Sequence, residues 1–216
     1  MERWMIAALL VGLAPASVQA QDFPRLAGAA AFDWTRPQWE AIPGFREAER
    51  RSACGFVAGE GIIRFFWRDP GMDVIGELKH VARAHGWWSA GDGMYGSEAF
   101  QAMMSHFGME LTLQPEWLDA RWRTEASLNE DPAVGDLYNR MLAVLERGYP
   151  VVLATTRHYF LVQGHDGQGR LLAGNTGEIM AYRGLGGSSW MTVGAMARNG
   201  DIVVGLLAPA AALIQP

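Results

Sequence analysis

The change in sequence pattern at Pro150 most constrains what this chain can fold into. Before this proline, several segments carry apolar residues at helical spacing. After it, residues 151–154 and 158–162 are short apolar runs typical of buried strands, and residues 166–169 are typical of a hairpin turn. Residues 202–207 form a further apolar run and predict a closing strand. Helices followed by strands predict an α+β fold, in which a helical lobe precedes an antiparallel sheet lobe.

The helical part divides at recognisable breaks. Gly86 and Gly148 follow two of the expected helices and are typical of helix C-caps, and Ser97 is the expected N-cap of a third helix. Residues 109–113 alternate as a short strand does, and residues 170–174 predict another strand. Residues 115–134 are polar and give no clear pattern. The expected helices are residues 56–67, 74–85, 98–106 and 137–147.

The first 20 residues have the pattern of a secretory signal peptide. Arg3 precedes a short apolar stretch at residues 5–14, and Val18-Gln19-Ala20 is typical of a cleavage site. An uncleaved anchor helix is the alternative, but Pro15 and the shortness of the apolar stretch disfavour it. We therefore expect a secreted or periplasmic protein with no stable membrane insertion after cleavage. Its organisation would be a signal peptide at 1–20, an irregular arm at 21–50 and one domain at 51–216.

Composition makes several classes of function improbable. The net charge is -5, and lysine and arginine form no run, which disfavours nucleic-acid binding. His, Cys and carboxylate residues form no pair with metal-ligand spacing that a second pair supports, so no metal or cofactor is expected.

Cys54 is the only cysteine in the chain, and it stands at the start of the expected helix ending near residue 67. The N–H groups and partial positive charge of a helix N-terminus stabilise a thiolate, which is the nucleophilic form of cysteine. An unpaired cysteine in an exported protein also suggests an intermolecular pair or a free reactive thiol. The alternative is a buried cysteine that only fills space.

A cysteine nucleophile needs a base and a residue that orients this base, and His158 is the best candidate for the base. His80, His85 and His106 lie on or at the ends of expected helices, and His165 lies at the hairpin turn. If Gly167-Gln168 is a two-residue turn, Asn175 faces Phe160 and is a diagonal neighbour of His158 on the same face. A register shift of one residue would place Asn175 on the other face, and a turn role for Asn175 is the alternative.

The ordered set of motifs resembles papain-fold cysteine peptidases of the C39-like type, as found in phage tail and peptidoglycan-processing proteins. The matching pieces, in order, are Ala53-Cys54-Gly55, Gly86-Trp87, Gly93-Met94, Gly96, Pro150 to Leu153, His158-Tyr159-Phe160, Gly164-His165-Asp166, Gly174 to Gly177 and Ser189 to Thr192. The resemblance implies that Cys54 is the nucleophile, His158 the general base and Asn175 the orienting residue. It also implies a papain-like arrangement of two lobes.

One departure from the family concerns the oxyanion hole. Such enzymes carry a glutamine a few residues before the cysteine, but residues 46–53 contain none. The backbone N–H of Cys54 would still donate, with Ser52 as a further candidate donor. Removing one such donor typically slows catalysis about 100- to 1000-fold.

These observations lead to an expected function and leave two alternatives. The expected function is an exported cysteine peptidase or amidase that forms an acyl-enzyme on Cys54 and hydrolyses a peptide bond, with peptidoglycan stem peptides as the candidate substrate. One alternative is a catalytically inactive papain-like module that binds a peptide or glycan through Trp87, Trp88 and Tyr95 in the glycine-rich loop. The other is acyl transfer through the same nucleophile and base.

Overall fold

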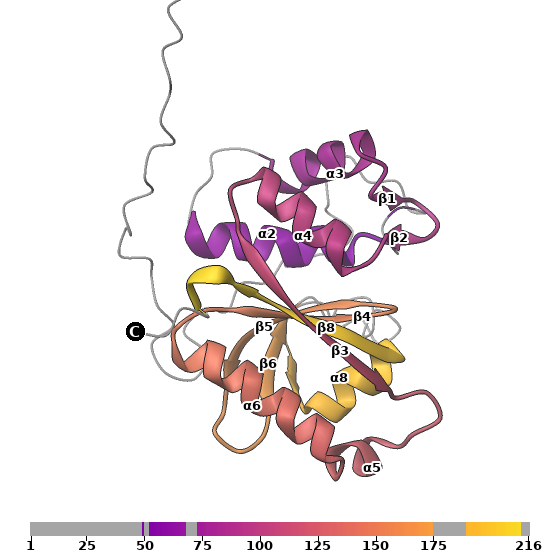
Figure 1. Cartoon of the computed structure of the whole chain (residues 1–216), viewed down its shortest axis with the longest axis vertical. Helices are drawn as coiled ribbons and strands as arrows, with labels where there is room; N and C mark the ends of the chain where they lie inside the picture. The colour runs from indigo at the N-terminus through magenta and orange to yellow at the C-terminus, as the bar shows by residue number, and fades with distance from the viewer. Residues whose placement is uncertain (1–48, 50–51, 68–72, 175–188, 213–216) are drawn as a thin grey trace, which may run out of the picture.

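A computed structural model describes Glu49 and residues 52–67, 73–174 and 189–212 (Figure 1). The expected signal peptide, nearly all of the expected arm, and Asn175 lie outside the described residues. Within the described part, no helix combines the length and apolar character that crossing a membrane requires.

A six-stranded antiparallel sheet forms the centre of the fold, with the strand order β3-β8-β4-β5-β6-β7 (Figure 1). The last long strand of the chain, β8, pairs with both β3 and β4, so it joins the first strand of the sheet to the rest. The strands are β3 (Leu111–Asp119), β4 (Val151–Thr155), β5 (Tyr159–His165), β6 (Leu171–Gly174), β7 (Ser189–Met191) and β8 (Ile202–Pro209).

Three helices from the first half of the chain cover one face of this sheet (Figure 1). They are α2 (Cys54–Phe66), α3 (Val74–Ala84) and α4 (Ser97–His106). A small hairpin of β1 (Trp88–Ser89) and β2 (Gly93–Met94) connects α3 to α4. This layer agrees with the helical lobe predicted from the sequence.

Helices also cover the opposite face of the sheet, which the prediction of a helical lobe followed by a sheet lobe did not anticipate. They are α5 (Glu125–Asn129), α6 (Pro132–Glu146) and α8 (Val193–Gly200), followed at the end of β8 by a 3-10 turn, η3 (Ala210–Ala212). The described fold is therefore α+β, with the sheet between two layers of helices (Figure 1).

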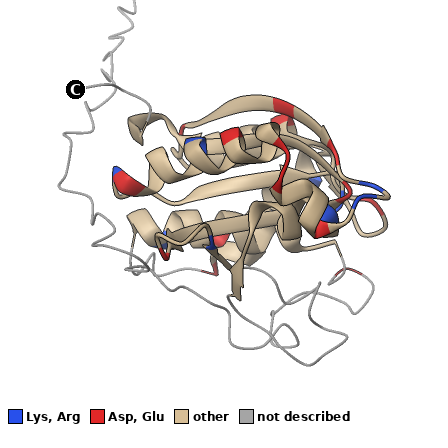
Figure 2. Cartoon of the chain, turned by 90° about the horizontal axis from the view of Figure 1, so that it is seen from below, with Lys and Arg blue, Asp and Glu red and all other residues tan. Residues whose placement is uncertain are grey.

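The sheet separates two apolar cores, and adjacent residues of β5 belong to different ones. Tyr159 and Leu161 pack with α2, α3 and α4, whereas Phe160 and Val162 pack with α6 and α8. This division follows from the alternation of side chains along a strand. Acidic and basic residues are interspersed over the described fold (Figure 2).

The helix boundaries confirm some expected caps and correct another. Gly86 and Gly148 adopt positive φ angles of 68° and 86° directly after the C-cap residues of α3 and α6, as expected for helix ends. Ser97 is not the N-cap of α4, because the cap is Gly96 and Ser97 is the first helical residue. Glycine fits this position because its φ is 90°, which a side chain would disfavour.

The β5–β6 hairpin keeps the predicted register at one end through two compensating irregularities. The turn contains three residues instead of two, because the N–H of Asp166 donates to the carbonyl of Arg170. A bulge at Gln163 then shifts the pairing back by one residue. Leu161 therefore pairs with Gly174, as the predicted register requires.

Candidate active site

Cys54 is the first residue of α2, as predicted, and its side chain is buried with 7% of the residue exposed. Ala53, the N-cap, offers no side-chain hydrogen bond to the first turn. Glycines allow neighbours to approach this helix closely: a Cβ at Gly55 would meet Met94 Cε at 3.3 Å, and one at Gly59 would meet Met104 Sδ at 3.0 Å. The two glycines therefore let α2 pack closely against β2 and α4. The first turn of α2, which carries the thiol, keeps N–H groups that no side chain caps.

A cavity of about 440 Å³ adjoins the thiol. One wall is the segment from Gly91 to Gly96 together with Ser52, and the other is the chain between β4 and β5. The lining residues are Ser52, Cys54, Gly91, Asp92, Gly93, Met94, Gly96, Thr155, Thr156, Arg157, Tyr159 and Val204. The thiol therefore borders a space between the helical layer and the sheet that is large enough for part of a peptide.

Charged groups stand on both walls of this cavity. Asp92 lies on the helical side and accepts a hydrogen bond from the Ser89 hydroxyl at 2.9 Å. Arg157 lies on the sheet side, is 68% exposed at its side chain and pairs with Asp201 at 3.2 Å. A ligand that carries both an amine and a carboxylate, as peptides do, would find a partner of opposite charge on each wall.

Ser52 does not fit the role of an oxyanion donor that the sequence suggested. Its hydroxyl lies 3.0 Å from the carbonyl oxygens of both Glu49 and Ala90, and its N–H donates to Glu49. The carbonyl of Ser52 accepts the indole N–H of Trp88 at 2.8 Å. Ser52 therefore ties the start of α2 to the β1–β2 hairpin.

Trp88 accordingly supports the site from within the core. Only 4% of this residue is exposed, and its ring lies 5.3 Å from that of Phe56 in a tilted arrangement. Trp87 stacks on His85, with ring centroids 4.4 Å apart. Tyr95 is 51% exposed and, of these three aromatic residues, is the one whose surface is most available to a ligand.

A buried carboxylate just before Cys54 was not recognised in the sequence. Glu49 is 4% exposed and forms ion pairs with Lys79 at 2.7 Å and Arg83 at 2.5 Å. Arg83 in turn lies over the ring of Trp88, 5.3 Å from its centroid. No local pattern in the sequence identifies Glu49 as buried, because its partners Lys79 and Arg83 lie on α3.

The tight turn between β4 and β5 is fixed by one hydroxyl. Thr155 Oγ1 accepts from the N–H of His158 at 2.9 Å and donates to the carbonyl of the same residue at 2.8 Å. A Cβ at Gly200 would overlap the Thr155 side chain, so only glycine fits there. This arrangement sets the positions of Thr156, Arg157 and Tyr159 along the cavity.

The structure places His158 beside the cavity segment but in contact with the other core. The residue is 2% exposed, and its ring lies 4.6 Å from that of Phe160, which belongs to the core on the far face of the sheet. Its neighbours Arg157 and Tyr159 line the cavity. The pairing of His158 with Cys54 stays a prediction, as does the orienting role of Asn175.

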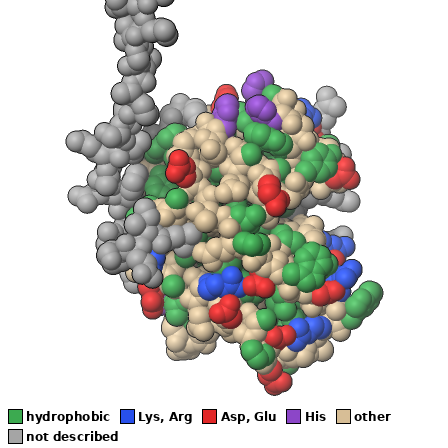
Figure 3. Space-filling model, viewed as in Figure 1, with side chains coloured by type: hydrophobic (Ala, Val, Ile, Leu, Met, Phe, Trp, Pro, Cys, Tyr) green, Lys and Arg blue, Asp and Glu red, His purple; other side chains and the backbone are tan. Residues whose placement is uncertain are grey.

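None of the other histidines is among the residues that line the cavity. The side chains of His85 and His106 are near one another, with ring centroids 6.3 Å apart, and histidines gather at the outer end of the helical layer (Figure 3). His165 ends β5 at the hairpin turn. The positions of His85, His106 and His165 agree with the helix ends and the hairpin turn expected from the sequence.

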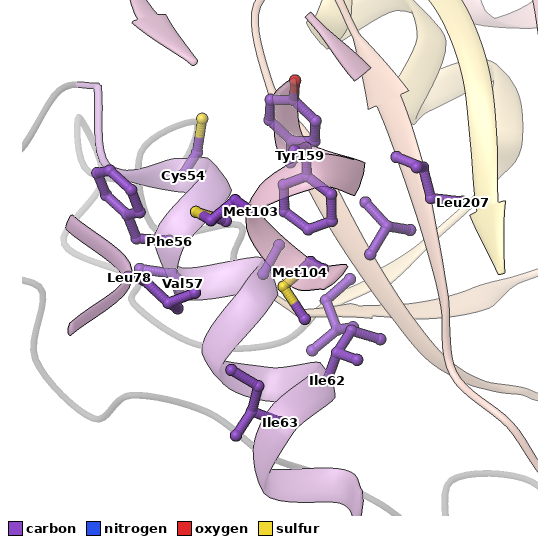
Figure 4. Close-up of a cluster of buried hydrophobic side chains, with 14 of the residues drawn as sticks. Cys54, Phe56, Val57, Ile62, Ile63, Leu78, Met103, Met104, Tyr159 and Leu207 are labelled. Atoms are coloured by element: carbon purple, nitrogen blue, oxygen red, sulfur yellow. The ribbon is translucent and has the colours of Figure 1, made fainter. Parts of the chain in front are cut away.

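Tyr159 is the residue that the structure brings to Cys54 and that sequence reasoning missed. It lines the same cavity, and the thiol and the phenol point to the same end of the apolar cluster (Figure 4). Burial raises the pKa of Tyr159, and the nearby charges of the Cys54 thiolate and Glu98 raise it further. The phenol therefore keeps its proton at neutral pH and can only act as a neutral hydrogen-bonding group.

Among the described residues, no cluster of three or more His, Cys, Asp or Glu side chains has the arrangement of a metal site. Comparison with known proteins adds no assignment: no protein-family model matches the chain, and no curated protein matches it significantly.

Proposed function

We propose that this chain is an exported, papain-like cysteine peptidase or amidase of the C39-like type. The observation that carries the proposal is the position of the Cys54 thiol, at an uncapped helix N-terminus and on the wall of a cavity between helices and sheet. A helix N-terminus stabilises both a thiolate and a developing oxyanion, so this position suits acyl chemistry.

In the proposed reaction, the Cys54 sulfur attacks an amide carbonyl, forming a carbon–sulfur bond. His158 takes the thiol proton and gives it to the leaving amine as the carbon–nitrogen bond breaks. Water then attacks the thioester, releasing the acid and restoring the thiol. Asn175 is the proposed orienting residue for His158. Peptidoglycan stem peptides are the proposed substrate because they carry the amine and carboxylate groups that Asp92 and Arg157 would meet.

The test is incubation of the mature chain with purified peptidoglycan, followed by mass analysis of the soluble products. We expect fragments that are absent with Cys54→Ala and still present with His165→Ala, which leaves the proposed site intact. Identical product masses from the wild type and Cys54→Ala would overturn the proposal, because Cys54 is the only nucleophilic thiol in the chain.

A second candidate is a binding module without catalysis. It is favoured by Ser52, whose N–H and hydroxyl are both directed at backbone carbonyls. This candidate predicts that wild type and Cys54→Ala sediment equally with peptidoglycan and that neither releases fragments. Weaker binding by Tyr95→Ala would then identify the exposed aromatic residue as part of the binding surface.

A further inference from the structure

The proposed reaction needs a second hydrogen-bond donor for the oxyanion, besides the N–H of Cys54. Three hydroxyl groups on the cavity wall are directed elsewhere. Ser52 contacts the carbonyls of Glu49 and Ala90, and Thr155 donates to the carbonyl of His158 at 2.8 Å. Thr156 donates to the carbonyl of Gly200 at 3.1 Å. The Nε of Arg157, also on the wall, pairs with Asp201 at 3.2 Å.

Tyr159 carries the fourth hydroxyl among the residues that line the cavity. The residue is 5% exposed, and its ring stacks on that of Phe100, with centroids 5.0 Å apart and planes 16° apart. This packing fixes the direction of the phenol, which points to the same end of the cluster as the Cys54 thiol (Figure 4). Because burial keeps the phenol protonated, its O–H is a donor at any pH at which the thiolate reacts.

We infer that the Tyr159 hydroxyl donates a hydrogen bond to the oxyanion that forms when Cys54 attacks a carbonyl, and so takes the place of the absent glutamine. This inference rests on the proposed function. When the sulfur bonds to the carbonyl carbon, the π electrons move onto oxygen, and the phenol stabilises that charge without giving up its proton. The charge is strongest in the tetrahedral intermediate, so the interaction favours the transition state over the bound substrate.

The test compares two reactions at the same thiol in wild type and Tyr159→Phe. Alkylation by iodoacetamide displaces iodide and forms no oxyanion, whereas acylation by p-nitrophenyl acetate passes through one. Phenylalanine keeps the ring stacked on Phe100 and removes only the hydroxyl. We expect acylation to slow about 100- to 1000-fold. We expect the rate of alkylation to change by less than about 2-fold and the midpoint of its pH dependence by less than about 0.3 pH units. The loss of a hydrogen bond to the thiolate would change both by more.

The ratio of acylation rate to alkylation rate is the deciding quantity, because both reactions sample the same folded fraction. Phe100→Leu is the comparison variant: it keeps the hydroxyl but removes the stacking that directs it, so the ratio should fall, by less than in Tyr159→Phe. An unchanged ratio in Tyr159→Phe would overturn the inference while leaving the proposed function standing. A parallel fall of both rates would also overturn it, since the phenol would then act on the thiolate. Wild type that is alkylated but never acylated would refute the proposed function itself.

Discussion

Replacing Thr155 with valine tests whether one hydroxyl holds the turn that carries the cavity wall. Valine keeps the branched shape of threonine but cannot accept the N–H of His158, which lies 2.9 Å from Thr155 Oγ1. Both residues are buried, at 5% and 2% exposure. The carbonyl of His158 keeps its bond from the N–H of Thr155 at 2.9 Å. The buried group that loses its acceptor is the N–H of His158, and the part-buried N–H of Arg157, 3.4 Å from the same oxygen, loses a weaker contact.

Depriving one buried donor of its acceptor costs about 1–3 kcal/mol. For a chain of this length, each kcal/mol corresponds to about 2–4 °C in melting temperature, so the expected decrease is roughly 2–12 °C. Urea denaturation followed by tryptophan fluorescence measures the change, and we expect a lower midpoint with an unchanged slope.

Thr155→Ser is the control, because it keeps the hydroxyl and loses one methyl group, worth about 0.8 kcal/mol. If the serine variant were less stable than the valine variant, the side chain would act through its packing against Gly200, and the argument from the hydroxyl would be refuted.

Three further predictions concern the charged and titratable groups. Because the pKa of Tyr159 is raised by folding, its stabilisation is complete below the unfolded value near 10 and is lost as the pH rises above it. The unfolding free energy of wild type should therefore fall above pH 10 by up to about 1.4 kcal/mol per pH unit more steeply than that of Tyr159→Phe, in alkaline urea titrations. Glu49→Gln should lower the unfolding free energy by about 3–5 kcal/mol, since it breaks a buried ion pair with Lys79, and equal denaturation midpoints would contradict this. His158→Ala should abolish hydrolysis and His165→Ala should retain most of it; the opposite result in a product assay would show that the base has been assigned to the wrong histidine.

Most elements could be predicted because their residues are periodic. The Cys54 helix, α3, α4 and four of the strands lie close to their expected ranges. The strand within residues 115–134 could not be predicted because β3 lies at the edge of the sheet. It carries exposed side chains, such as that of Trp117, which is 69% exposed, and so lacks the uniformly apolar pattern of a buried strand. The start of α6 had a local signal in Asp131-Pro132, an N-cap followed by proline in the first turn.

The candidate site was partly predictable for a different reason. Cys54 was identified because its place at a helix start depends only on neighbouring residues. The partners of Ser52, Glu49 and Trp88 lie on other elements, 30 to 38 residues away in the chain, so no local pattern reveals them. Tyr159 was missed because an aromatic residue in an apolar run is expected to be core, and only the tertiary structure shows that its polar end reaches the cavity.

The bulge at Gln163 restores the pairing register of the β5–β6 hairpin. The extra turn residue would by itself exchange the two faces of β6 along its whole length, but the bulge cancels the shift within four residues of the turn. A change in the length of the distal loop therefore need not alter the strand end nearest Cys54, as long as the pairing of Leu161 with Gly174 is preserved. An epitope or a fluorophore-bearing peptide could therefore be inserted between Asp166 and Arg170 as a reporter. The strand end nearest the thiol would keep its position.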